Sequence, residues 1–398
     1  MKITFYNTFD IAVPILPKFV DYMSGNDETM SCTFVTASSR YRGVSKKLDG
    51  PERKEIPIPD IFSGSKAISH FIYLIGASCH IFFSRSDVSI FFTQPPFGLP
   101  IFCLFARLRR KKYVVHVMDY HPSFVGVSSN STFSRFMRRV LDYLYISSLK
   151  NAAHVVAIGE CMEGLLTDKG VQTSKISTIR NISSVESLPY RDDQSCALPE
   201  DLEAFCKDRI LVLYAGNQGI AHEFSTILSV SKKLRDTHVF VFIGSGHRNK
   251  EIRDQISKNK LDNVRVSGFL EDREFENVNK RADLHFISLR EQYTGLMVPS
   301  KFYSSLESGS IVLFEGHKKC EISRCIEHHD CGFSVPSGNE LEMLAALRAT
   351  SESSDDELGS MRTAARELYY EKFCADIFCY TYHTMFKKVC NEIEELVV

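Results

Sequence analysis

Residues 211–224, LVLYAGNQGIAHEF, decide the fold of this chain. An apolar run typical of a buried strand leads into a short turn containing Gly216, Asn217 and Gly219, and a helical stretch follows. Small residues between a strand and a helix let main-chain N–H groups approach a ligand closely, and the start of the helix favours an anion. The same pattern also forms ordinary tight turns, so this stretch alone leaves both interpretations open.

A second loop of this kind follows one strand later, in FIGSGHRNKEI (242–252). There Gly244 and Gly246 precede Arg248 at the start of an expected helix. One glycine pair is weak support for a phosphate site. Two such loops at successive strand ends of one domain are better support.

A third stretch, GLMVPSKFYSSLESG (295–309), contains the basic residue Lys301. Pro299 and Ser300 are typical helix-start residues, so Lys301 is expected in the first helical turn. The helix dipole disfavours a cation there unless an anion is bound nearby. A diphosphate ligand would account for this lysine, and a solvated lysine is the alternative.

Short apolar runs alternate with helical stretches along nearly the whole chain, which predicts an α/β fold with doubly wound parallel sheets. The expected strands are 2–6, 33–37, 89–93, 113–117, 153–158 and 176–179, then 210–214, 238–243, 264–267, 284–287 and 311–314. The expected helices are 101–112, 133–150 and 160–169, then 223–235, 248–258, 272–281, 301–308 and 357–395, the last with a break near 373–375.

The length of 398 residues exceeds what one core normally supports, and the strand and helix series restarts after a polar segment. We therefore expect two Rossmann-like domains with a cleft between them, where ligands of such sheets bind. The expected boundaries are an N-terminal domain at 1–185, a linker at 186–208, a C-terminal domain at 209–372, and a final helix at 373–398 that packs back on the first domain.

Composition excludes several classes of protein. The 29 Phe and 16 Tyr argue against disorder, and no run of about 18 apolar residues suggests a membrane-spanning helix. The chain has no Trp and a net charge of −1, and it lacks a recognised nucleic-acid module. Its 12 Cys at irregular spacings fit reduced thiols, and its first residues look like a strand of a mature cytoplasmic protein.

The charge is distributed unevenly between the two halves. Residues 1–185 carry 22 Lys and Arg against 14 Asp and Glu, and nine of these basic residues fall between 101 and 150. Apolar residues such as Phe133 and Phe136 alternate there with arginines at a helical period. Such a helix can lie on an anionic lipid surface, and an arginine-rich solvent face of a helix packed on its own sheet is the alternative.

The three quoted stretches and SGFLED (267–272) occur in an order and spacing that resemble the nucleotide-sugar domain of family 4 retaining glycosyltransferases. The likeness is greatest to the bacterial branch that makes O-antigen, capsule and colanic acid. In the first half, TQPP (93–96), VVHVMDYHP (114–122) and residues 154–181 are similar to the same enzymes. The resemblance covers nearly the whole chain.

This resemblance implies the GT-B fold, with an acceptor-binding first domain and a donor-binding second domain. The residues that would line the diphosphate pocket are Gly216, Asn217, Gly219, Gly244 and Gly246. Phe269 and Leu270 would meet the nucleobase through their main chain. Ser300 and Lys301 would hold the phosphates and donor sugar, with Lys301 also counted as catalytic. Asp119 and His121 would face the scissile bond.

Two departures from the wider family concern ribose and phosphate binding. Most members carry a Glu pair eight positions apart whose second member holds the ribose, and Leu296 and Ser304 stand at those positions here. Many members also carry an Arg and a Lys after the first glycine, where Asn217 and His222 stand. The remaining candidates for positive charge are Arg248, Arg290 and Lys301.

No Asp-x-Asp motif occurs, so we expect transfer without a metal or any other cofactor. The cysteines and histidines between Cys320 and Cys331 match no common zinc spacing. The expected function is retaining transfer of a sugar from a nucleotide sugar to a lipid-linked or oligosaccharide acceptor at the inner face of the plasma membrane, reached through the basic helices around 101–150. Two alternatives are a GT-B type UDP-GlcNAc epimerase and an inactive homologue that acts as an assembly partner.

Overall fold

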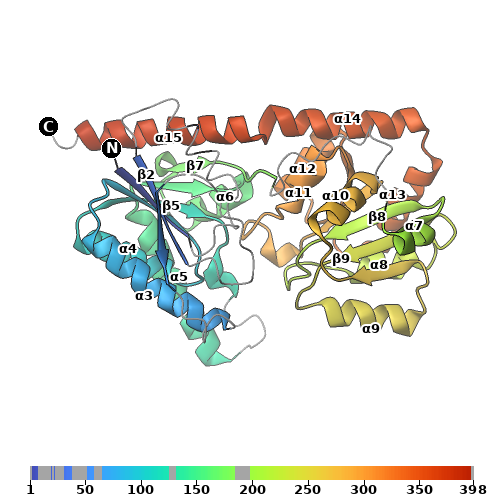
Figure 1. Ribbon diagram of the computed structural model, residues 1–398, viewed down its shortest axis with the longest axis horizontal. Coiled ribbons are helices and arrows are strands. Elements are labelled where there is room, and N and C mark those ends of the chain that lie inside the picture. Colours follow the sequence, from blue (N-terminus) through green and yellow to red (C-terminus); the bar gives the residue numbers. More distant parts are fainter. Residues whose placement is uncertain are drawn as a thin grey trace. The chain divides into compact units, whose positions relative to one another are not determined.

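The computed structural model describes residues 2–7, 19, 22, 31–37, 52–57, 65–124, 131–183 and 198–395 (Figure 1). The chain folds into two compact units. The first unit contains residues 1–180, 295–298 and 375–398, and the second contains residues 181–294 and 299–374. Both are α/β units in which every paired strand runs parallel to its neighbours.

The first unit is built on a seven-stranded sheet in the order β3-β2-β1-β4-β5-β6-β7. Its strands are β1 (Lys2–Tyr6), β2 (Ser31–Ala37), β3 (Glu52–Ile56), β4 (Val88–Phe92), β5 (Lys112–Val117), β6 (His154–Ala157) and β7 (Ile176–Thr178). Its helices are α3 (Lys66–Phe83), α4 (Leu99–Leu108), α5 (Thr132–Lys150), α6 (Glu160–Asp168) and α15 (Ala375–Glu395), with short 3₁₀ turns η2 (His121–Phe124) and η3 (Thr173–Lys175).

The second unit is built on a six-stranded sheet in the order β10-β9-β8-β11-β12-β13. Its strands are β8 (Ile210–Ala215), β9 (His238–Ile243), β10 (Val264–Ser267), β11 (Leu284–Ser288), β12 (Ile311–Gly316) and β13 (Gly332–Pro336). Its helices are α7 (Glu200–Cys206), α8 (Ser225–Ser231), α9 (Asn249–Asn259), α10 (Asp272–Arg281), α11 (Lys301–Glu307), α12 (Glu321–His329), α13 (Glu340–Glu352) and α14 (Asp355–Lys372), with a 3₁₀ turn η4 (Glu291–Tyr293).

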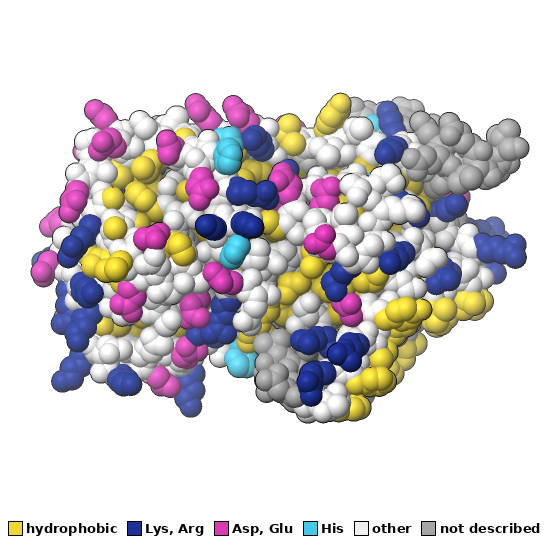
Figure 2. Space-filling model, turned by 180° about the vertical axis from the view of Figure 1, so that it is seen from behind, with side chains coloured by type: hydrophobic (Ala, Val, Ile, Leu, Met, Phe, Trp, Pro, Cys, Tyr) yellow, Lys and Arg dark blue, Asp and Glu magenta, His cyan; other side chains and the backbone are white. Residues whose placement is uncertain are grey.

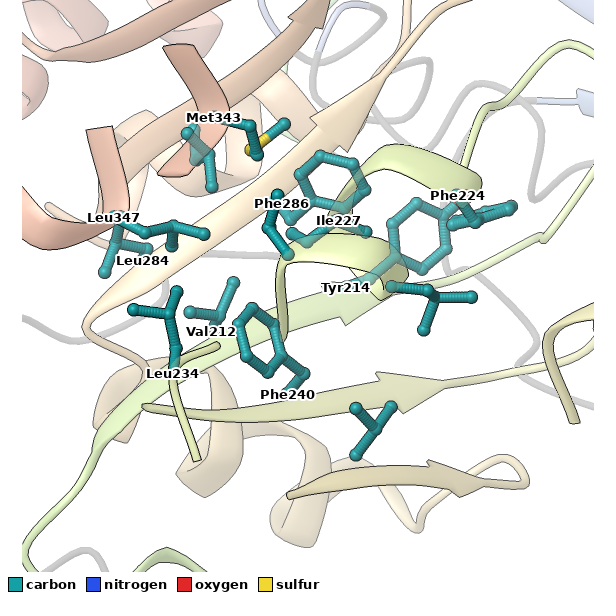
Figure 3. Packing of buried hydrophobic residues seen from close by; sticks show 14 of the residues in the cluster. Val212, Tyr214, Phe224, Ile227, Leu234, Phe240, Leu284, Phe286, Met343 and Leu347 are labelled. Atoms are coloured by element: carbon teal, nitrogen blue, oxygen red, sulfur yellow. The ribbon is translucent and has the colours of Figure 1, made fainter. Parts of the chain in front are cut away.

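Strand β8 is apolar along its length because both faces of its sheet are covered by helices. Val212 and Tyr214 point into one core cluster, which also contains Phe240 and Phe286 (Figure 3). Leu211 and the alternate residues of the neighbouring strand belong to a second cluster on the opposite face. This two-sided burial fixes the strand and therefore the position of the turn that follows it.

Most expected elements agree with the structure, but the expected linker does not. Part of segment 186–208 folds as helix α7, and Leu198, Leu202 and Cys206 join the core of the second unit. Leu202 and Cys206 lie four residues apart on one face of α7, and Leu198 precedes the helix; the polar composition of the segment obscures this short apolar face. Residues 186–197 of the expected linker lie outside the described residues.

Five further elements, α3, β3, α12, β13 and α13, are also absent from the sequence-based expectation. Strand β3 has the charged sequence ERKEI, and among the described strands it pairs with β2 alone, so it is an edge strand that needs no apolar pattern. Helix α3 is apolar nearly all round, which hides its helical period.

The C-terminal helical stretch is interrupted at Phe373 and Cys374, between α14 and α15. Helix α15 clusters with the first unit, where the rings of Phe378, Tyr382 and Phe386 surround Phe19. The Tyr382 hydroxyl also lies 3.1 Å from Nδ1 of the buried His116 on β5. The last helix of the chain is therefore part of the core of the first unit.

Candidate active site

Main-chain hydrogen bonds join the two glycine loops of the second unit, which lie at 216–219 and 244–246. Gly216 N donates to the carbonyl oxygen of Ile243 (2.9 Å), and Gln218 N donates to that of Ser245 (2.9 Å). A Cβ added to Gly244 would lie 2.4 Å from the Gly216 carbonyl oxygen, and one added to Gly246 would lie 2.5 Å from that of Gln218. Gly244 and Gly246 are therefore needed for loop packing, and their expected place in the pocket stays a prediction.

Gly216 has its open side toward Lys301. Its φ is +114°, and an added Cβ would lie 3.1 Å from Cε and 3.6 Å from Nζ of Lys301. Among the described residues, the main-chain N–H groups of Asn217 and Gly219 have no hydrogen-bond acceptor. This turn therefore presents two main-chain donors beside a cation.

Lys301 is half-buried, and its Nζ lies 4.8 Å from the ring centroid of Tyr214. Burial lowers the pKa of this ammonium group to about 8. Within the part of the chain that the structure describes, no carboxylate forms an ion pair with it. A desolvated ammonium group with only an aromatic face as a partner is costly, and a bound anion would remove that cost.

Tyr214 also holds the turn in shape. Its ring is part of the core cluster and lies edge-on to Phe224 at 4.9 Å between centroids (Figure 3). Its hydroxyl donates to the carbonyl oxygen of Asn217 (2.7 Å). One side chain at the end of β8 therefore supports both the loop and the lysine, a role that the sequence did not predict because Tyr214 fits an ordinary strand pattern.

Glu223 lies at the centre of a charged network next to this turn. Its carboxylate accepts hydrogen bonds from the N–H groups of Phe224 and Ser225 and an ion-paired hydrogen bond from Nε of Arg290 (2.9 Å). Burial alone would raise its pKa, but the hydrogen bonds from Ser225 and the positive charge of Arg248 outweigh burial and lower the pKa to about 2. Glu223 is therefore ionised throughout the physiological range and fixes the Arg290 side chain.

Arg248 is buried, and Nε, Nη1 and Nη2 of its guanidinium group each donate a hydrogen bond within the protein. It pairs with Glu251, donates to the carbonyl oxygen of His222 (2.7 Å), and lies 3.4 Å from Glu223. These contacts give Arg248 a structural role next to the turn. Its expected contact with a phosphate stays a prediction, and Arg290 is the more accessible of the two arginines.

His222 directly precedes Glu223, and its carbonyl oxygen accepts the hydrogen bond from Arg248. Its Nδ1 lies 2.6 Å from the carbonyl oxygen of Ser288, at the end of β11. Burial, together with the nearby charge of Lys301, lowers its pKa to about 3, so the ring is neutral. His222 therefore cannot replace the missing cation of the wider family, and Lys301 and Arg290 are left to supply positive charge.

The other expected donor residues lie on loops and helix starts of the same unit. Phe269 is exposed, and the carbonyl oxygens of Ser267 and Gly268 in its loop accept from Gly244 N (3.2 and 3.3 Å). This places the main chain of the expected base-binding turn, including Leu270, beside the second glycine loop. Ser300 is exposed at the start of α11.

Ser304 donates its hydroxyl hydrogen to the carbonyl oxygen of Lys301 in its own helix (3.0 Å). Its oxygen retains acceptor capacity, but a hydroxyl turned back onto the helix is a weaker ribose contact than a carboxylate. Ser304, which stands where most members of the wider family have the second Glu, therefore directs its hydroxyl hydrogen to its own helix.

In the first unit, Asp119 and His121 follow the end of β5. The Thr93 hydroxyl oxygen accepts hydrogen bonds from the N–H groups of Met118 (3.1 Å) and Asp119 (3.2 Å), which fixes the turn. Burial raises the pKa of Asp119 to about 6 and lowers that of His121 to about 4. The Nε2 atom of His121 is buried and has no hydrogen-bond partner among the described residues.

These values give the two side chains different chemistry. Near neutral pH, Asp119 is a carboxylate whose pKa suits proton transfer, and His121 is a neutral ring. Thr93, the residue after β4, fixes the turn that carries Asp119 because its hydroxyl oxygen accepts hydrogen bonds from the N–H groups of Met118 and Asp119. No sequence pattern assigned a role to Thr93, although it lies in the TQPP stretch.

No group of three or more His, Cys, Asp or Glu side chains suited to a metal ion occurs among the described residues. The ten cysteines whose side chains the structure describes are free thiols. No helix within the described ranges has both the length and the apolar character needed to cross a bilayer.

Two Rossmann-like units with parallel sheets in these strand orders constitute the GT-B fold of glycosyltransferases, as expected from the sequence. A crystal structure of HepE from Anabaena in complex with UDP and glucose has this architecture, with a TM-score of 0.70 and 12% identity, covering 98% of this chain and 100% of HepE. No protein-family model matches the chain.

Two proteins with similar sequences are also named as glycosyltransferases. The chain is 25% identical over 297 residues to a protein of Pseudomonas aeruginosa named probable glycosyltransferase WbjE, covering 73% of this chain and 72% of WbjE. It is 21% identical over 269 residues to WcaI of Escherichia coli K12, named for colanic acid biosynthesis, covering 66% and 65%. The expected resemblance to glycosyltransferases is confirmed, and these relatives support a transferase over the two alternatives.

Proposed function

We propose that this glycosyltransferase moves a sugar from a nucleoside diphosphate sugar to a lipid-linked or oligosaccharide acceptor in surface polysaccharide synthesis. The observation that carries this proposal is Lys301, a desolvated ammonium group beside the Gly216 turn without a carboxylate partner among the described residues. A diphosphate supplies the missing negative charge. The UDP held by HepE makes UDP the first nucleotide to test.

The reaction breaks the bond between the anomeric carbon and the diphosphate, so negative charge grows on the leaving group. Lys301, which lies beside Gly216, and the N–H groups of Asn217 and Gly219 in the same turn would stabilise this charge. Arg290, fixed by Glu223, adds a second cation to the same unit. Donors that are fixed before the reaction stabilise such charge strongly because they need no reorganisation.

We propose further that transfer proceeds without a metal ion and with retained anomeric configuration. The side-chain cations would take the place of a metal on the diphosphate, and the sequence lacks the Asp-x-Asp motif that holds such a metal in the other major transferase fold. Proton NMR of the product linkage tests retention, and an inverted anomer would refute it. Activity in excess EDTA tests metal independence, and restoration by Mg²⁺ or Mn²⁺ would refute it.

Asp119 is proposed to accept the proton of the acceptor hydroxyl or to orient the transferred sugar, with His121 as the neighbouring polar contact. The pKa of about 6 at Asp119 and of about 8 at Lys301 predict a bell-shaped profile of kcat/KM between these values. Activity rises with pH as Asp119 ionises and falls as Lys301 loses its proton. Asp119→Asn should remove the acid limb of the profile and leave the alkaline limb.

The proposed acceptor is carried on a lipid at the inner face of the plasma membrane, which the enzyme reaches through the basic helices between 101 and 150. An assay with donor alone and with donor plus lipid-linked acceptor tests this proposal. The sugar nucleotide should be consumed only with acceptor present. Turnover of free donor would instead favour the epimerase alternative, and absence of turnover with every donor and acceptor would favour the inactive homologue.

A further inference from the structure

Helix α3 exposes an apolar stripe that the core of the first unit does not use. Its opposite side is buried at Tyr73, Ala77 and Ile81. On the outer side Phe71 is 61% exposed and Phe83 is 77% exposed. The other large apolar side chains of this stripe are Ile68 and Ile75. A row of large apolar side chains exposed to solvent commonly marks a contact surface.

The neighbouring helices α4 and α5 continue this apolar surface. Helix α4 exposes Leu104 and Leu108, and α5 exposes Phe133, Phe136 and Tyr143. Helix α3 packs beside α4, and α4 beside α5. Figure 1 shows these three helices adjacent to one another on the first unit. The stripes therefore belong to one face, here called the α3–α5 face.

The same face is strongly basic. Its exposed cations are Arg107, Arg109, Arg110, Lys112, Arg135, Arg138 and Arg139. In Figure 2, yellow apolar and dark blue basic side chains gather together at the lower right of the view. The guanidinium carbon of Arg109 lies 5.2 Å from the ring centroid of Phe82, so a basic and an apolar side chain are in direct contact at the end of α3.

Negative charge is nearly absent from these helices. Asp142 is the only acidic residue in α3, α4 and α5, and its carboxylate is bound by Lys169 (2.8 Å) and by the Tyr120 hydroxyl. The positive charge of the face is therefore not offset by carboxylates of its own helices. A contact partner must offer both apolar material and negative charge.

We propose that the α3–α5 face docks on an anionic lipid bilayer, with the uncharged stripe of α3 inserted among the acyl chains and the arginines of α4 and α5 at the headgroups. The proposal deepens the proposed function, because it rests on a lipid-linked acceptor and extends the contact surface from the basic helices to α3. Apolar insertion and headgroup attraction add together in interfacial helices. A second copy of the chain is a poorer occupant, because two such faces would bring like charges together.

The test is cosedimentation with vesicles of phosphatidylglycerol and phosphatidylcholine, compared with vesicles of phosphatidylcholine alone. We expect binding to the anionic vesicles that weakens as salt is added. The double variant Phe71→Ser, Phe83→Ser should bind about tenfold more weakly, because two exposed rings no longer enter the bilayer. Arg138→Ser, Arg139→Ser should bind about tenfold more weakly and lose part of the salt dependence.

Matched controls lie in the second unit. Leu341 is 80% exposed, and Leu341→Ser should bind vesicles as the wild type does. The exposed pair Lys232 and Lys233, replaced by Ser, is the control for the arginine variant. The melting temperature and the circular dichroism spectrum of each variant, compared with those of the wild type, show whether it is folded.

Vesicle binding needs neither donor nor transfer, so its failure is distinct from failure of the proposed function. Unchanged binding of Phe71→Ser, Phe83→Ser would overturn the role of α3. Equal binding to neutral and anionic vesicles, or no vesicle binding at all, would overturn the proposal. So would a dimer of the wild-type protein, measured by light scattering, that this double variant converts to a monomer.

Discussion

Lys301 is the residue on which the account of the donor site depends. Its ammonium group is desolvated beside Gly216 and Tyr214, and this environment lowers its pKa to about 8. A folded protein that holds a lysine with a lowered pKa gives up stability whenever that lysine is charged. Lys301 therefore lowers the free energy of unfolding of the free protein, and a bound anion should raise it again.

The first prediction is that Lys301→Met raises the free energy of unfolding of the free protein. The unfolded chain binds more protons than the native protein between about pH 8 and pH 10.5, so the stability of the wild type rises through that window. The variant should lack this rise and should be more stable at pH 7, by on the order of 1 kcal/mol. Urea denaturation at several pH values measures both effects.

Lys232→Met is the matched control, because Lys232 is an exposed lysine of the same unit. It should leave the free energy of unfolding within about 0.5 kcal/mol. A Lys301→Met protein less stable than the wild type at pH 7 would show that the lysine has a partner in the free protein.

Residue identities in this site could be predicted only in part from the sequence. The Gly216 turn and Lys301 can be identified from the sequence, because small residues after a strand and a lysine in the first turn of a helix are features of the sequence itself. The engagement of Arg248 with Glu223 and Glu251, and the support of Lys301 by Tyr214, depend on side chains that meet only after folding. No local pattern encodes such contacts.

At the scale of elements, the two strand-to-helix loops act as one structure. Gly216 N donates to Ile243, and Gly244 has a φ of +115° with no room for a side chain. The loop that presents N–H donors near Lys301 is therefore held by the loop of the next strand. A change in the second loop should propagate to the first.

The second prediction is that Gly244→Ala destabilises the protein by about 2–4 kcal/mol and weakens nucleotide binding. An added Cβ would lie 2.4 Å from the Gly216 carbonyl oxygen, so the Gly216 turn must move. Gly359→Ala in α14 is the control, because nothing lies within 4 Å of its added Cβ. That variant should be stabilised by about 0.5–1 kcal/mol.

Thermal unfolding with and without UDP measures both variants. If Gly244→Ala bound UDP as the wild type does despite its lower stability, the two loops would be independent in function. If it were as stable as Gly359→Ala, the close approach of the loops would be wrong.

Elements with a clear period were predicted well, and the exceptions have physical reasons. Strand β9 (His238–Ile243), strand β10 (Val264–Ser267) and helix α10 (Asp272–Arg281) have the expected bounds. The edge strand β3 lacks an apolar pattern because it is bonded on one side only. Helix α7 has too few apolar residues among its polar ones to show a clear helical period in the sequence.

At the scale of the whole molecule, the chain consists of two α/β units with different surface chemistry. The basic excess of the first half is concentrated on the α3–α5 face, together with exposed apolar side chains. In the acidic second half, Lys301 and Arg290 are the cations proposed to bind the donor. The charge asymmetry of the sequence therefore matches the division between the proposed lipid-binding face and the proposed donor site.

The third prediction concerns the return of the chain to the first unit through α15. Phe386 is fully buried, and its ring lies 5.4 Å from that of Tyr382 and 6.4 Å from that of Phe19. Phe386→Ala should cost the first unit about 3–5 kcal/mol, because it leaves a cavity among aromatic rings. Scanning calorimetry measures the loss, and UDP should still stabilise the second unit.

Tyr380→Ala is the control on the same helix, because Tyr380 is mostly exposed. It should change the stability by no more than about 0.5 kcal/mol. Equal effects of the two variants would contradict the packing of α15 in the core of the first unit.

The central claim, that Lys301 and the Gly216 turn bind the diphosphate of the donor, is tested most directly by calorimetric titration of UDP at pH 7 in the presence of EDTA. GDP, ADP and dTDP follow if UDP does not bind. The wild-type protein should bind one of these nucleotides, and Lys301→Met should bind it about 10–100-fold more weakly, because a charge-assisted contact is lost. Lys232→Met should bind as the wild type does. No binding of any nucleotide by the wild type, or equal affinity in Lys301→Met, would contradict the claim.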